Sequence, residues 1–96
     1  LGFNGAQLLA LALGGCFCND LRYVAEEMGV LLGRIAVSVV LELEGSPLLA
    51  KSAKMTVLCE KQDGDGAERV IERAKEVCMV ANSLGRGVAV SIEHAA

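Results

Sequence analysis

Residues 4–28 read NGAQLLALALGGCFCNDLRYVAEEM, and this stretch decides the fold. Asn4 followed by Gln7 three residues later is the capping-box pattern of a helix start. Gly29 supplies the residue type that most often ends a helix in the left-handed conformation. We therefore predict one long helix over residues 5–28.

The first half of this helix is apolar on every side, from Ala6 to Leu13 apart from Gln7. A helix of this kind is normally buried all round. Gly14 and Gly15 follow, and their small size predicts close approach by another element. The whole chain of 96 residues is 53% hydrophobic but only 3% aromatic, so its apolar mass is aliphatic. A domain of this length buries about 60–65% of its unfolded surface. The remaining apolar surface must therefore be covered by another subunit, by an absent segment, or by both.

The rest of the chain alternates between strand and helix patterns. Residues 35–44 alternate apolar and polar side chains, a turn cluster follows at 45–47, and residues 53–60 alternate again, which predicts a hairpin. Its inward side chains are Ile35, Val37, Val39, Leu41 and Leu43, then Ala53, Met55, Val57 and Cys59.

An amphipathic helix is expected next, capped by Asp65 with Glu68 as its capping-box partner and ending near Leu84 and Gly85. Its apolar stripe comprises Ala67, Val70, Ile71, Ala74, Val77, Cys78 and Ala81. A last strand is expected with Val88, Val90 and Ile92 inward. The predicted fold is α+β in the order α-β-β-α-β, with a long buried central helix and a second helix against an antiparallel sheet.

Charge and composition exclude several classes of protein. Nine basic against twelve acidic residues give a net charge of −3, so no basic field exists for duplex nucleic acid or an acidic membrane. Two Phe, one Tyr and no Trp exclude a binder of single strands that stacks bases on aromatic rings. The uncharged first 19 residues are interrupted by Gly, Asn and Gln, so we expect neither a membrane span nor a signal peptide. We expect a cytoplasmic protein with no nucleic-acid or membrane partner.

Cysteine is the one nucleophile that the sequence offers. The four cysteines form no CxxC pair, and with a single His they match no zinc-finger pattern. Cys16 on the first helix and Cys78 on the stripe of the second can meet if the helices pack face to face. Burial as a small hydrophobe is the commoner role of any one cysteine. Cys18 lies two residues from Cys16 and faces roughly the opposite side, and Cys59 has the parity of a core position.

Charged residues around Cys16 offer no clear activation of its thiol. Asp20, four residues after Cys16, would raise a thiol pKa rather than lower it. Arg22 and Arg34 could attract a thiolate, but spacing alone does not place either beside one. His94 is expected to be an exposed residue near the end of the chain.

Two segments resemble motifs of the OsmC/Ohr family, the osmotically inducible protein C and organic hydroperoxide resistance proteins. NGAQLLALALGGCF at residues 4–17 is similar to the family's central-helix motif, roughly N-P-E-x-L-L-A-A-x-x-A-A-C-F. CMVANSL at residues 78–84 is similar to C-P-x-S-N-x-L. The resemblance covers nearly the whole chain, and the spacing between the two motifs is similar to that in the family. It implies a single OsmC-like domain over residues 1–96, truncated at its N-terminus.

The resemblance also implies chemistry. Cys16 would be the peroxidatic cysteine, Cys78 would resolve its sulfenic acid to a disulfide, and a lipoyl-type dithiol would reduce that disulfide. The substrate would be an organic hydroperoxide, no cofactor would be needed, and the protein would be a homodimer with sites drawn from both subunits.

The sequence departs from the family pattern at activating positions. Ala6 stands where the family has Glu, and the family's active-site Arg lies in an N-terminal β-region that precedes this sequence. Met79 and Ala81 replace the Pro and Ser of the second motif. The alternative is therefore a non-catalytic OsmC-like dimer, structural or binding a small molecule. A third hypothesis is a thiolate metal site formed by Cys16, Cys18 and Cys78.

Overall fold

The first helix forms with the predicted bounds in the computed structural model, which describes residues 2–95. This helix, α1 (Gly5–Met28), begins after Asn4, whose side-chain oxygen accepts a hydrogen bond from the Gln7 backbone N–H at 2.8 Å. The Gln7 side-chain oxygen accepts one in return from the Asn4 backbone N–H at 2.9 Å. Gly29 ends the helix with a φ of 69°, a value that favours glycine. Both ends of α1 confirm the sequence prediction.

The predicted hairpin also forms, from β1 (Leu32–Glu44) and β2 (Leu49–Lys61), which pair antiparallel. Val37 lies opposite Val57, and Val39 lies opposite Met55. The predicted inward face is correct over its central part, where Ile35, Val37, Val39, Leu41, Met55, Val57 and Cys59 are buried or half-buried. It is wrong at Leu43 near the turn, which is exposed because the hairpin there extends beyond what the helices cover. Ala53 is also exposed, although it faces α1 across a groove.

The close approach predicted at two glycines occurs at one of them. A Cβ built on Gly14 would lie 3.2 Å from Cγ2 of Val39, so α1 crosses the apolar face of β1 at this residue. A Cβ on Gly15 would meet nothing within 4 Å. Only Gly14 therefore allows the helix to sit against the hairpin.

The second helix is divided, which corrects the prediction of one continuous helix. α2 (Glu68–Val77) and α3 (Met79–Arg86) meet at Cys78, whose backbone is extended with φ −66° and ψ 105°. The predicted cap at Asp65 is also wrong, since Ala67 occupies the N-cap position. The Asp65 carbonyl accepts a hydrogen bond from the Lys61 N–H, and the Ala67 N–H bonds to the Cys59 carbonyl. These bonds keep the chain extended beside β2 until residue 67.

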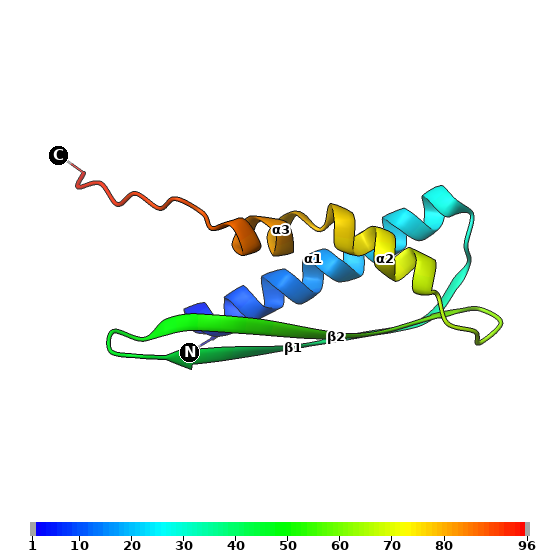
Figure 1. Cartoon of the computed structure of the whole chain (residues 1–96), viewed down its shortest axis with the longest axis horizontal. Helices are drawn as coiled ribbons and strands as arrows, with labels where there is room; N and C mark the ends of the chain where they lie inside the picture. Colours follow the sequence, from blue (N-terminus) through cyan, green and yellow to red (C-terminus); the bar gives the residue numbers. More distant parts are fainter. Residues whose placement is uncertain (1, 96) are drawn as a thin grey trace.

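The predicted last strand is absent within the described residues, so the element order is α-β-β-α-α rather than α-β-β-α-β. Residues 87–95 form no regular structure, and Val88, Val90 and Ile92 are 58%, 78% and 94% exposed. Figure 1 shows this segment leaving α3 and leading away from the hairpin. An alternating pattern makes a strand only where a neighbouring strand supplies hydrogen bonds, and among the described residues the sheet contains β1 and β2 alone.

The core lies where the second half of α1 meets β2 and α2. It is formed by Phe17, Leu21, Val24, Ala25, Cys59, Ala67, Val70, Ala74 and Cys78. α1 is long and apolar enough to cross a membrane by length and composition, but the half that contains Phe17 and Leu21 is packed into this core, as in the central helix of a folded domain.

The first half of α1 is not covered by this chain alone. Leu8 and Leu11 are 52% and 58% exposed. The prediction of a buried central helix is therefore correct for the second half of α1 but not for the first. The chain is elongated, 55 × 26 × 25 Å, with a radius of gyration of 16.0 Å against about 13 Å for a compact chain of this length. Part of the apolar surface that the sequence predicted to be in excess is thus located on the first half of α1, and another part lies on Val88, Val90 and Ile92.

Candidate active site

The structure brings together the two cysteines that the sequence singled out. The Sγ atoms of Cys16 and Cys78 lie 3.7 Å apart, although 62 residues separate them in the chain. Cys16 comes from the middle of α1 and is half-buried, whereas Cys78 lies at the junction of α2 and α3 and is 0% exposed. All four cysteines are free thiols.

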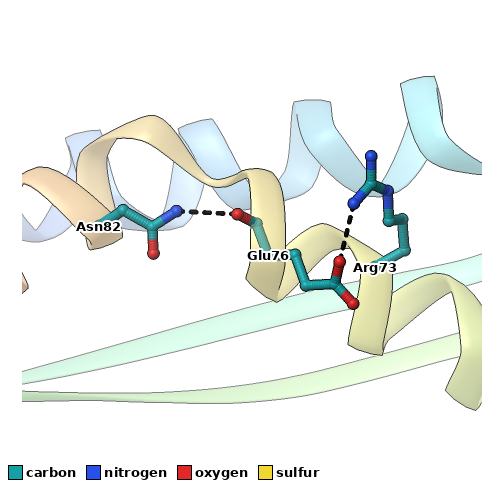
Figure 2. A network of polar contacts seen from close by, with 3 residues as sticks. All are labelled: Arg73, Glu76 and Asn82. Atoms are coloured by element: carbon teal, nitrogen blue, oxygen red, sulfur yellow. Dashed lines mark hydrogen bonds and ion pairs between the residues drawn. The ribbon is translucent and has the colours of Figure 1, made fainter.

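The α2–α3 junction is held by hydrogen bonds on both sides of Cys78. Its N–H bonds to the Ala74 carbonyl at the end of α2, and its carbonyl accepts the Asn82 N–H at the start of α3, both at 3.0 Å. Figure 2 shows the Asn82 side chain donating to the Glu76 carbonyl across the junction, at 3.0 Å. The Glu76 carboxylate accepts a hydrogen bond from Arg73 at 2.7 Å. The break in the helix is therefore fixed, and it holds Cys78 against α1.

Asp20 completes a line of polar contacts through the two sulfurs. The Cys78 thiol donates to Sγ of Cys16, and the Cys16 thiol donates to Oδ2 of Asp20 at 3.6 Å. Asp20 lies four residues after Cys16 on α1, so the two side chains lie on one face of the helix. The carboxylate is an acceptor placed for the proton of the Cys16 thiol.

The surroundings of Cys78 make its thiol a poor nucleophile. Burial, together with the neighbouring Cys16 and Asp20, raises the pKa of Cys78 to about 11, although the Ala81 backbone hydrogen bond acts in the lowering direction. Desolvation disfavours a thiolate, and an acidic neighbour does the same. Cys78 therefore keeps its proton at neutral pH and can donate it to the sulfur of Cys16.

A groove of about 370 Å³ lies between α1, the hairpin and α3, and neither Cys16 nor Cys78 lines it directly. Leu13, one turn before Cys16, and Ala81, whose N–H lies near the Cys78 sulfur, both line it. The other lining residues are Leu9, Val39, Leu41, Ala50, Lys51, Ser52, Ala53, Met55, Leu84 and Gly85. The size and mainly apolar lining are those of a small-molecule pocket.

The remaining candidate residues lie apart from the sulfur pair. Cys18 lines a different hollow with Gly14 and Gly15 on the opposite side of α1, as its spacing predicted. Cys59 is 4% exposed in the core, and burial raises its pKa. Arg34 is paired with Glu60 at 3.7 Å. This pairing directs Arg34 to β2 rather than to the thiols.

Arg22 on α1 and His94 in the segment after α3 are both exposed, and a further residue, Asn82, holds the α2–α3 junction. Asn82 had not been singled out, although it is the Asn of the second motif, and its position four residues after Cys78 was the available signal.

Comparison with known proteins identifies the family of this chain. The family model described as OsmC-like protein matches residues 1–93. The chain belongs to the OsmC-like family. Comparison with curated proteins gives no match.

Two solved structures of OsmC-like proteins share the fold. One is an OsmC-like hydroperoxide resistance protein from Jannaschia sp. CCS1, with a TM-score of 0.70 and 22% identity, covering 97% of this chain and 65% of that one. The other is an OsmC-like protein of unknown function from Vibrio cholerae, with a TM-score of 0.58 and 17% identity, covering 81% of this chain and 56% of that one. The OsmC-like chain described here thus spans less than two thirds of each of these proteins.

Proposed function

We propose that this OsmC-like chain reduces organic hydroperoxides, with Cys16 as the peroxidatic and Cys78 as the resolving cysteine. The observation that carries the proposal is the 3.7 Å separation of the two sulfurs, with an apolar groove lined by Leu13 and Ala81, which lie three residues from Cys16 and Cys78. A disulfide bond is about 2.0 Å long, so the sulfurs need to approach by only about 1.7 Å once one of them is oxidised.

The reaction assigns a different task to each side chain. The Cys16 thiol gives its proton to Asp20, and the thiolate attacks the distal oxygen of the peroxide. The O–O bond breaks, the alcohol leaves after taking up a proton, and Cys16 becomes a sulfenic acid. The Cys78 sulfur then displaces that hydroxyl as water, and the disulfide forms. An external dithiol reduces the disulfide by exchange and is itself oxidised to a disulfide.

The order of the two cysteines follows from their surroundings. Cys78 is fully buried with its pKa raised to about 11, so it is unsuited to be the first nucleophile. Cys16 is half-buried, and Leu13, one turn before it, lines the groove, so Cys16 is the more accessible thiol for a peroxide. The mainly apolar groove favours a substrate with a hydrocarbon group over hydrogen peroxide.

We also propose that the protein acts as a homodimer in the cytoplasm. Leu8 and Leu11 on α1, together with Val88, Val90 and Ile92, leave more apolar surface exposed than a soluble monomer normally shows. Four free thiols suit a reducing compartment. Sedimentation equilibrium at micromolar concentration should give twice the mass of the chain, and a stable monomer would contradict the dimer.

The competing function is a non-catalytic module that binds a small apolar molecule in the same groove. Ala6 favours it, because the family's Glu is missing at that position. Peroxide loss measured with cumene hydroperoxide and dihydrolipoamide decides between the two functions. The proposed peroxidase predicts turnover that disappears in Cys16→Ser and persists in Cys18→Ser. Equal rates in the wild type and Cys16→Ser would refute it and favour the binding module.

A further inference from the structure

A third atom able to bind a metal ion lies beside the two sulfurs that the proposed peroxidase reaction uses. The Sγ atoms of Cys16 and Cys78 and a carboxylate oxygen of Asp20 all lie within 4.8 Å of one another. Two of these donors come from successive turns of α1, and the third comes from the α2–α3 junction. Thiolate sulfur with carboxylate oxygen is a ligand set that suits zinc and related thiophilic cations.

Two of the three distances between the donors match a tetrahedral site, and the third, between Cys78 Sγ and the Asp20 carboxylate, is no longer than 4.8 Å. Zinc binds thiolate sulfur at about 2.3 Å and carboxylate oxygen at about 2.0–2.2 Å. At a tetrahedral angle these bonds place two sulfurs about 3.8 Å apart and a sulfur and an oxygen about 3.5–3.7 Å apart. The observed separations are 3.7 Å between the two sulfurs and 3.6 Å between Cys16 Sγ and Asp20 Oδ2. Two edges of the coordination tetrahedron are therefore already formed.

The charged groups around the donors also favour the binding of a cation. The acidic groups Cys16 and Asp20 are the neighbours whose charge acts on Cys78, and Arg34 is engaged with Glu60. A divalent cation bound here would displace the two thiol protons and stabilise the resulting thiolates beside the Asp20 carboxylate. Because Cys16 and Asp20 are only half-buried, a fourth position can be filled by water.

We propose that Cys16, Asp20 and Cys78 form a binding site for one zinc-class divalent cation per chain, with water as the fourth ligand. The sequence had suggested Cys18 as the third ligand. The structure replaces it with Asp20, since Cys18 faces the hollow on the other side of α1. Metal binding would occupy both sulfurs and so block peroxide reduction, a consequence that rests on the proposed function, whereas the site itself does not.

Titration of the reduced chain with Co²⁺, a spectroscopic substitute for Zn²⁺, tests the site. We expect one Co²⁺ per chain, tetrahedral d–d bands in the visible, and a sulfur-to-cobalt charge-transfer band with the intensity of two thiolates. Zn²⁺ should displace the Co²⁺. Cys16→Ser and Cys78→Ser should each halve the charge-transfer intensity and weaken binding more than tenfold.

Two further variants make the assignment of the third ligand decisive. Asp20→Asn has the same shape and should weaken Co²⁺ binding about tenfold with an unchanged far-ultraviolet circular dichroism spectrum. Cys18→Ser should bind as the wild type does. The site is overturned if the wild type shows no charge-transfer band, if Asp20→Asn binds equally well, or if Cys18→Ser weakens binding as much as Cys78→Ser.

The metal site and the peroxidase can fail separately. Peroxide turnover without Co²⁺ binding would overturn the metal site alone. Co²⁺ binding by a chain that does not consume cumene hydroperoxide would uphold the site and refute the proposed peroxidase.

Discussion

The sulfur of Cys78 lies 3.7 Å from that of Cys16 because the helix that carries Cys78 breaks at that residue. The Asn82 side chain holds the break by donating to the Glu76 carbonyl. Proximity of the sulfurs, protonation of Cys78 and the adjoining groove all depend on this junction. Each gives rise to a prediction that can be measured.

Removing the Asn82 side chain should loosen the junction. Asn82→Ala deletes one hydrogen bond to a backbone carbonyl, so we expect a loss of about 1 kcal/mol in the free energy of unfolding. It should also slow the formation of the Cys16–Cys78 disulfide after peroxide addition. Arg73→Ala is the matched control, since an exposed ion pair contributes about 0–1 kcal/mol and does not cross the junction. Equal rates of disulfide formation in Asn82→Ala and the wild type would show that the junction does not position Cys78.

Alkaline pH should destabilise the reduced chain through Cys78. Burial raises the pKa of this thiol to about 11 in the folded chain, whereas an unfolded thiol titrates near its ordinary value of about 8.5. The folded state then binds more protons between these values, so stability is full below the lower pKa and falls as pH rises toward the higher. Urea unfolding from pH 8 to 11, with a non-thiol reductant, should show this loss. In Cys78→Ala the loss should be smaller, and an identical profile would count against the burial of a protonated thiol.

Two adjacent glycines in α1 should respond differently to the same substitution. Ala is favoured over Gly in a helix by about 1 kcal/mol, and Gly15→Ala meets nothing within 4 Å, so it should stabilise the fold. Gly14→Ala gains the same propensity but places its Cβ 3.2 Å from Val39, which must move. Denaturant unfolding should therefore show a higher free energy of unfolding for Gly15→Ala than for Gly14→Ala. The reverse order would mean that α1 does not cross β1 at Gly14.

The groove should determine the preference among peroxides. Ala53 is exposed on β2 and lines the groove, so Ala53→Asp should lower kcat/KM for cumene hydroperoxide about tenfold, as expected for a polar group in an apolar pocket. Its kcat/KM for hydrogen peroxide should change little. Val40→Asp, at an exposed position of β1 outside the groove, is the control. A parallel loss for both peroxides would indicate that the groove does not bind the organic group.

Local signals made α1 predictable. Asn4, Gln7 and Gly29 fix its ends through bonds to the immediate backbone, so the sequence placed both ends correctly. The period of two along residues 35–41 likewise predicted the hairpin and the central part of its inward face. The pairing of Cys16 with Cys78 was predictable as a hypothesis because each cysteine lies on an apolar helix face.

Features that depend on distant atoms were not predictable. The break at Cys78 is held by a hydrogen bond from the Asn82 side chain. The apolar stripe of residues 67–81 continues past Cys78 with helical spacing, so the sequence pattern gives no sign of the break. The start of α2 shifted from Asp65 to Ala67 because backbone bonds to β2 compete with a local cap. Residues 88–92 alternate as a strand does, but alternation does not supply the neighbouring strand that pairing requires.

The central claim is tested most directly by mapping the disulfide formed in a single turnover. The reduced Cys18→Ser chain is treated with one equivalent of cumene hydroperoxide, remaining thiols are alkylated, and proteolytic peptides are weighed by mass spectrometry. The account predicts a Cys16–Cys78 disulfide as the main product, with Cys59 alkylated only after unfolding. A disulfide that involves Cys59, or a peroxide-treated chain in which Cys16 and Cys78 both remain reduced, would contradict it.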